Sequence, residues 1–117
     1  MKKLYFLKFG SAATVPDLEK ILAGRLDLHF HKHSSSYLGN YLKYSGMLSE
    51  SLTIGENRLP SGDLRVPERD DFLCIVDVAI NKGKNTERSA RYKFLKRALT
   101  QISELSLVSD QMVESSE

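Results

Sequence analysis

The sequence lacks the features that mark several classes of protein. It has no tryptophan, one cysteine and three prolines in 117 residues, and none of its apolar runs approaches the roughly 18 residues of a membrane span. The single cysteine, Cys74, cannot form an internal disulfide, and its place in the run FLCIVDVAI predicts a buried side chain rather than a reactive thiol. The start MKKLYFLKF resembles a signal peptide, but Lys8 interrupts the apolar stretch and no cleavage site follows. We therefore expect a cytoplasmic protein without a membrane segment.

Motifs of catalysis and nucleotide binding are also missing. There is no Gly-x-Ser-x-Gly nucleophile motif. There is no glycine-rich phosphate loop either. The segment NKGKNTE contains a Gly-Lys pair, but it lacks the earlier glycine that a phosphate loop carries at a fixed spacing before that pair. These absences favour a protein that is not an enzyme and that carries no cofactor.

The composition is that of one globular domain spanning residues 1–117. Hydrophobic residues make up 41% and charged residues 27%, with a net charge of +2. The charge is uneven: residues 51–80 hold three basic and six acidic side chains, and residues 81–100 hold seven basic and one acidic. Residues 101–117 hold four acidic side chains and no basic one. Such blocks steer partners without determining the fold.

Two segments have the periodicity of helices packed on one side. In residues 14–25, Thr14 is placed to cap the first turn, Pro16 falls within that turn, and Gly24 is placed to end the helix. The second helix is expected over residues 86–105. Its predicted apolar stripe is Ala90, Phe94, Leu95, Ala98, Leu99, Ile102 and Leu105, and its predicted basic outer face is Arg88, Arg91, Lys93, Lys96 and Arg97.

Strands are expected over residues 3–9, 25–33, 37–44, 51–54 and 72–80, the last of them as the central strand. Residues 106–113 have the composition of a short further strand, and residues 110–117 are expected to form a frayed tail. The order strand-helix-four strands-helix predicts an α+β fold. We expect a mostly antiparallel sheet of four to five strands with two helices on one face, for which a split β-α-β arrangement is one candidate.

The stretch HFHKHSSSYLGNYLKYSG, residues 29–46, is the most unusual in the chain, and we interpret it as a long bent strand with an outer contact face. His29, His31 and His33 alternate, so they would share one face of a strand. Two such histidines can bind zinc, but the outer two are about 13 Å apart and no second cluster completes a site. We therefore predict no metal. The alternative is a small nucleic-acid-binding or nuclease-like domain that uses these histidines and the basic last helix.

A protein-binding surface is the other hypothesis. Aromatic side chains dominate interface hot spots, and acidic side chains attract basic partners. The candidate interface residues are Tyr37, Tyr41, Glu56, Asp63, Glu68, Asp70 and Asp71. Two plainer interpretations stay open, namely that the tyrosines pack under a helix and that the acidic residues form a solvated loop.

From Ser35 to Val78 the sequence resembles the small immunity proteins of bacterial polymorphic-toxin and contact-dependent growth-inhibition systems. The similar residues are SSYLGNYLKYSG, then LTIGEN, then FLCIVDV, followed by a final helix. The histidine row and the basic last helix depart from that pattern. The resemblance implies a protein that binds one cognate toxin domain, often a nuclease, and blocks its active or substrate-binding site. It assigns no individual residue a role.

Overall fold

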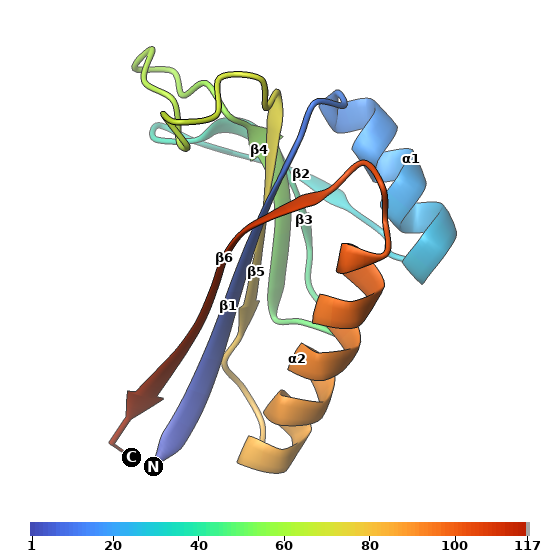
Figure 1. Ribbon diagram of the computed structural model, residues 1–117, viewed down its shortest axis with the longest axis vertical. Coiled ribbons are helices and arrows are strands. Elements are labelled where there is room, and N and C mark those ends of the chain that lie inside the picture. Colours follow the sequence, from blue (N-terminus) through green and yellow to red (C-terminus); the bar gives the residue numbers. More distant parts are fainter. Residues whose placement is uncertain (117) are drawn as a thin grey trace.

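The computed structural model of the protein describes residues 1–116, which form a six-stranded antiparallel sheet with two helices on one face (Figure 1). The elements are β1 (Lys2–Ser11), α1 (Val15–Leu26), β2 (His31–Ser35), β3 (Gly39–Tyr44), β4 (Ser51–Glu56), β5 (Cys74–Ile80), α2 (Asn85–Thr100) and β6 (Ser106–Ser115). The strand order is β2-β3-β4-β5-β1-β6. The predicted α+β class and antiparallel sheet are confirmed, but the sheet has more strands than the four to five expected.

The additional strand is β6, at the end of the chain. It pairs with β1 along its length, with Met112 opposite Tyr5 and Ser115 opposite Lys2. This pairing supplies backbone hydrogen bonds that a free tail would not have. The expectation of a frayed tail is therefore wrong for residues 110–115, and Glu117 lies outside the described residues.

Helix α1 begins as its sequence predicts and ends later than predicted. The Thr14 hydroxyl oxygen accepts a hydrogen bond from the backbone N–H of Asp17 at 3.3 Å, which caps the first turn. The helix passes through Gly24 and ends at Asp27, whose φ of 54° is left-handed. Aspartate tolerates this conformation better than most side chains. Asp27 therefore ends the helix in the role that was expected of Gly24. The strand expected over residues 25–33 consequently begins only at His31.

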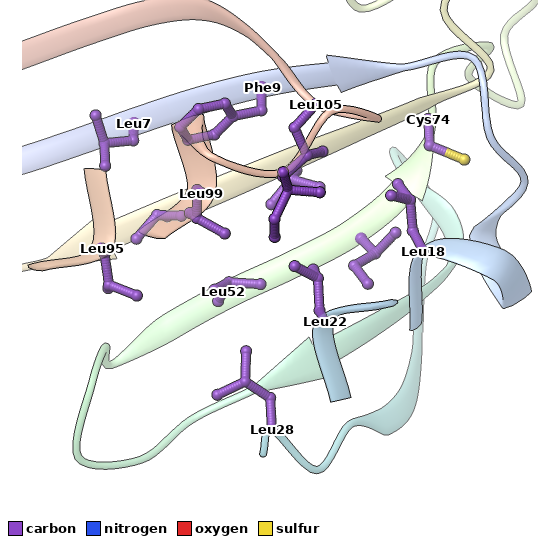
Figure 2. Close-up of a cluster of buried hydrophobic side chains, with 14 of the residues drawn as sticks. Leu7, Phe9, Leu18, Leu22, Leu28, Leu52, Cys74, Leu95, Leu99 and Leu105 are labelled. Atoms are coloured by element: carbon purple, nitrogen blue, oxygen red, sulfur yellow. The ribbon is translucent and has the colours of Figure 1, made fainter. Parts of the chain in front are cut away.

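The main apolar core lies between the two helices and the face of the sheet that they cover (Figure 2). Helix α1 contributes Leu18 and Leu22, and α2 contributes Leu95 and Leu99, all fully buried. Alternate residues of β1, β4 and β5 complete the core from the sheet side, as strand periodicity requires. Residues 72–80 were expected to form the central strand, and β5 does lie inside the sheet, between β4 and β1.

The buried face of α2 differs from the predicted stripe. Leu95 and Leu99 are buried as expected, but Ala90 is exposed and the Phe94 side chain is 50% exposed. Arg88, which was placed on the solvated basic face, is only 2% exposed. The reason is that its guanidinium finds oxygen acceptors at the start of the helix, so a cation occupies a core-facing position.

Residues 29–46 form a hairpin rather than one long bent strand. Strands β2 and β3 pair with His31 opposite Lys43 and His33 opposite Tyr41, and residues 36–38 make the turn between them. His29 precedes the strand, so the three histidines do not share one strand face. The histidine row of the sequence is therefore only partly preserved in the structure.

The elements outside the β2-β3 hairpin follow the split β-α-β arrangement. They are strands β1, β4, β5 and β6 and the two helices, and the hairpin adds two strands to the sheet beside β4. A long loop, residues 57–73, connects β4 to β5 at one end of the sheet (Figure 1).

Among the described residues, neither helix combines the length and apolar character needed to cross a membrane.

Candidate partner-binding surface

The predicted interface residues gather at one end of the sheet, shown at the top of Figure 1. Tyr37 lies in the turn of the β2-β3 hairpin, Tyr41 lies in β3, and Glu56 is the last residue of β4. The others lie in the long loop. We call this set the acidic end surface: Tyr37, Tyr41, Glu56, Asp63, Glu68, Asp70 and Asp71.

The long loop has an ordered conformation that depends on Asn57. This residue is 1% exposed. Its side-chain N–H groups donate to the carbonyl oxygens of Arg69 and Phe72, both at 3.1 Å, and its side-chain oxygen accepts from the N–H of Val66 at 2.9 Å. Its backbone N–H donates to the carbonyl of Leu73 at 2.9 Å. A loop with its buried groups satisfied in this way has one preferred shape.

Two side chains fix the same loop onto the sheet face that the helices leave open. Arg65 lies over Gly55 and forms an ion pair with Asp77 of β5. The Phe72 ring lies against Gly10 of β1, so closely that a Cβ at Gly10 would be 2.1 Å from the ring. The apolar run around Asp77 made that carboxylate conspicuous in the sequence, but nothing there indicated Arg65 as its partner. The loop is thus held in place by contacts with distant residues.

The carboxylates of the acidic end surface differ in their pairing. Asp71 accepts two hydrogen bonds from the Arg69 guanidinium, both at 2.9 Å, and that interaction lowers the pKa of Asp71. Within residues 1–116 the other four carboxylates form no salt bridge; they are Glu56, Asp63, Glu68 and Asp70. Because Arg65 and Arg69 are committed to Asp77 and Asp71, Arg58 is the remaining arginine of the loop. The charged side chains of the loop that form no salt bridge within residues 1–116 therefore carry a net negative charge.

Glu56 stands where the surface is hollowed. It lines a cavity of about 340 Å³ together with Val15, Pro16 and Asp70, next to the start of α1. It also lines a hollow of about 440 Å³ that includes Tyr41. The structure therefore brings Glu56 together with Asp70 on one side and with Tyr41 on the other. Tyr37, Asp63 and Glu68 line neither hollow.

The two tyrosines have different surroundings. Tyr37 is 67% exposed at the hairpin turn, so it is available to a partner. Tyr41 is partly buried and stacks on His33 with ring centroids 5.6 Å apart. It lies on the open face of the sheet, opposite Gly55, so it does not pack under a helix. Of these two tyrosines, Tyr37 is the one with most of its surface free.

Cys74 is buried, as its apolar neighbours predict. Its side chain is 1% exposed, and its thiol donates to the carbonyl oxygen of Ala13 at 3.0 Å. Burial, with a smaller contribution from the charge of Glu56, raises the pKa of the thiol to about 11. A thiol with that pKa is almost entirely protonated at neutral pH, so it is a poor nucleophile.

The histidines are dispersed in the structure. His29 approaches Asp27 at 3.9 Å, and both side chains are largely exposed. His31 and His33 lie on the exposed strand β2. The part of the chain that the structure describes contains no group of three or more His, Cys, Asp or Glu side chains placed to hold a metal ion.

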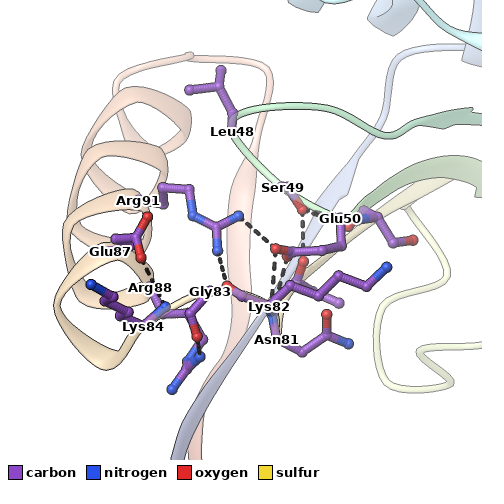
Figure 3. A network of polar contacts seen from close by, with 12 residues as sticks. Leu48, Ser49, Glu50, Asn81, Lys82, Gly83, Lys84, Glu87, Arg88 and Arg91 are labelled. Atoms are coloured by element: carbon purple, nitrogen blue, oxygen red, sulfur yellow. Dashed lines mark hydrogen bonds and ion pairs between the residues drawn. The ribbon is translucent and has the colours of Figure 1, made fainter.

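The basic side chains of α2 are largely engaged inside the molecule (Figure 3). Arg88 donates to the backbone carbonyls of Lys3 and Gly83. Arg91 forms an ion pair with Glu50 at 2.7 Å. These arginines are therefore tied to oxygen acceptors of the protein, which makes the helix a weaker candidate for phosphate binding than its sequence indicates.

Lys96 is also engaged, because it pairs with Asp110 of β6 at 2.6 Å. Lys93 and Arg97 remain exposed on the outer side of the helix.

Comparisons of the chain with protein-family models, with curated proteins and with solved structures return no match.

Proposed function

We propose that this protein is an immunity protein that binds a cognate bacterial toxin domain one-to-one and blocks its active or substrate-binding site. The observation that supports the proposal is the group of unpaired carboxylates on a loop fixed to the sheet. Glu56, Asp63, Glu68 and Asp70 form no salt bridge within residues 1–116, and Asn57 and Arg65 hold the loop that carries most of them. A rigid surface loses little conformational entropy when it binds.

The charge of that surface favours a nuclease as the toxin. A nuclease binds phosphates through basic side chains, and an acidic surface of fixed shape is complementary to such a site. Opposite charges also speed the encounter of the two proteins. Tyr37, exposed beside the loop, supplies an aromatic contact of the kind that is common in interface hot spots.

The experiment that tests the proposal uses the gene directly upstream of the one that encodes this chain. The C-terminal domain of that upstream product is expressed from an inducible promoter in a bacterial host, with and without the chain. The proposal expects arrested growth without the chain, restored growth with it, and a one-to-one complex in size-exclusion chromatography with light scattering. Toxicity that the chain does not relieve would contradict it.

A filter-binding titration separates this proposal from the nucleic-acid hypothesis. The probes are a double-stranded DNA and a single-stranded RNA, each at salt concentrations from about 50 to 200 mM, where affinity for phosphates falls steeply. The immunity proposal expects no retention of either probe. Retention that decreases steeply with salt would favour a nucleic-acid-binding domain instead.

A further inference from the structure

Strand β6 is an open edge of the sheet. The strand order places β2 at one edge and β6 at the other, and within residues 1–116 β1 is the one strand that pairs with β6. An edge strand presents a row of N–H and C=O groups that can pair with another strand. In β6 this row extends over the 10 residues from Ser106 to Ser115.

The two edges differ in their protection against pairing. Strand β2 has 5 residues and carries Lys32 between two histidines, which are common devices against edge-to-edge association. Strand β6 is twice as long and contains no lysine, arginine or proline. Three of its four apolar side chains are exposed, namely Leu107 at 44%, Met112 at 47% and Val113 at 44%, whereas Val108 packs against the smaller core cluster. These features are typical of an edge that a partner covers.

We propose that a second copy of this chain covers the edge, with the two β6 strands paired antiparallel across a two-fold axis. Such a dimer would continue one sheet through both subunits. In an antiparallel pair, opposed side chains point to the same face. A two-fold axis perpendicular to the sheet keeps each residue and its copy on the same face. Opposed residues can then share a face only if the axis passes beside one residue, which lies opposite its own copy.

Charge and the length of the overlap together favour one residue. Centring the pair on Asp110 would oppose this carboxylate to itself, and centring it on Met112 would oppose Asp110 to Glu114. Like charges directly opposite each other are destabilising. Centring on Val113 would overlap only residues 111–115 of the strand, and centring on Ser109 would overlap residues 106–112 with the bulged Val108 next to the axis.

Centring on Gln111 avoids these conflicts. It opposes residues 109–113 in regular register, and residues 107–108 then lie beside residues 114–115 of the other copy. The Gln111 side chains then meet as two amides, which can donate and accept reciprocally. Asp110 opposes Met112, and Ser109 opposes Val113. The carboxylate of Asp110 is paired with Lys96 at 2.6 Å. The β-bulge lies in β6 itself: Ser109 is opposite Lys8 and Leu107 is opposite Phe9, so Val108 has no partner in β1. In the two-fold pair this bulge falls at both ends of the overlap, once in each copy.

Cysteine cross-linking tests this register. Gln111→Cys places two thiols opposite each other, about 4.5–5.5 Å apart at Cα, within the range of a disulfide. Val113→Cys is the matched control, because its copy lies four residues away along the strand, roughly 13 Å. The native Cys74 is 1% exposed and does not compete. The inference expects rapid formation of a covalent dimer by Gln111→Cys under mild oxidation and little by Val113→Cys. Equal rates for the two variants would overturn it.

Sedimentation measures the association without a cross-link. The unmodified chain is analysed from about 1 μM to 1 mM, because an interface limited to one strand pair is at the small end of stable interfaces. A concentration-dependent dimer is expected, and Gln111→Lys is expected to weaken it at least tenfold by opposing two cations. Ser34→Lys, on the other edge, should leave the dissociation constant unchanged. A chain that stays monomeric throughout would overturn the inference, whatever the outcome of the growth test above.

Discussion

The side-chain N–H of Asn57 donates to the backbone carbonyl oxygen of Phe72 at 3.1 Å, across the full width of the long loop. Asn57 directly follows β4, and Phe72 lies two residues before β5. This contact therefore closes the loop at its base, and four carboxylates of the acidic end surface lie between the two residues: Asp63, Glu68, Asp70 and Asp71. The shape of the loop therefore depends on this buried amide together with the contacts of Arg65 and Phe72.

Replacing that amide should loosen the loop and destabilise the fold. Asn57→Ala leaves two carbonyls and the N–H of Val66 without their partner, and each unsatisfied buried group costs about 1–3 kcal/mol. Since water reaches part of this region, we expect a loss of about 2–4 kcal/mol in the free energy of unfolding. Urea denaturation measures that loss, and hydrogen exchange should show faster exchange within residues 57–73.

Asn40→Ala is the matched control, because Asn40 is exposed at the same end of the sheet. Its effect on stability should stay within about 0.5 kcal/mol. If both variants unfold at the same urea concentration, Asn57 does not organise the loop.

Arg88 and Arg97 lie on the same helix and should respond very differently to replacement. Arg88 is 2% exposed and donates to the carbonyls of Lys3 and Gly83 and to the side-chain oxygen of Asn85. Arg88→Met keeps much of the apolar stem but removes every donor, so about 2–4 kcal/mol of stability should be lost. Arg97→Met, at an exposed site, should change stability by less than about 0.5 kcal/mol. Thermal and urea unfolding of both variants check the contrast, and equal losses would refute it.

The local parts of the fold were predictable from the sequence because they depend on neighbouring residues. Thr14 caps the helix three residues before the N–H it binds, and Leu18 and Leu22 face the core because they are one turn apart. The apolar run that became β5 is long enough to indicate an inner strand by itself. These features follow from periodicity and capping chemistry alone.

The features that were missed depend on contacts between distant residues. Arg88 is buried because it meets Lys3, 85 residues away, and no helical pattern shows that. The position of the long loop depends on Arg65 and Asp77, which are 12 residues apart in the chain. The sequence did place the acidic residues in a loop, but it could not show which carboxylates pair. The sequence did indicate a short further strand over residues 106–113, but its length and its place at the edge of the sheet were missed, because residues 110–117 were expected to be frayed.

The Glu50–Arg91 ion pair makes stability depend on pH. Burial works against ionisation of Glu50, but the hydrogen bonds from Arg91 and from the backbone N–H of Asn81 outweigh it and hold the pKa of Glu50 below its ordinary value of 4.5. The folded protein therefore binds this proton less readily than the unfolded chain does. The resulting stabilisation is fully present above about pH 5 and is lost as the pH falls through the lowered pKa.

Glu50→Gln tests this dependence by urea denaturation at several pH values. The variant should be less stable than the unmodified protein at pH 7, and the difference between them should shrink as the pH falls toward 3. Glu68→Gln, at an exposed residue outside any salt bridge within residues 1–116, is the control and should show a much smaller difference. A Glu50→Gln difference that is constant with pH would show that the carboxylate charge is not its source.

The pairing of carboxylates on the acidic end surface predicts which of them govern capture of the toxin. Asp70 forms no salt bridge within residues 1–116, whereas Asp71 is paired with Arg69. Asp70→Lys should therefore slow association with the toxin domain identified by the growth test by about tenfold at low salt, and should reduce the salt dependence of the rate. Asp71→Asn should have a smaller effect, because its charge is already largely compensated. Stopped-flow mixing at two salt concentrations measures both rates.

Glu114→Lys is the control for total charge, because Glu114 lies at the far end of the sheet from the long loop (Figure 1). It alters the net charge as much as Asp70→Lys does but leaves the acidic end surface intact. If the two lysine variants slow association equally, the toxin responds to overall charge and not to this surface. If neither slows it, the partner binds elsewhere, and the carboxylates of the long loop are simply solvated.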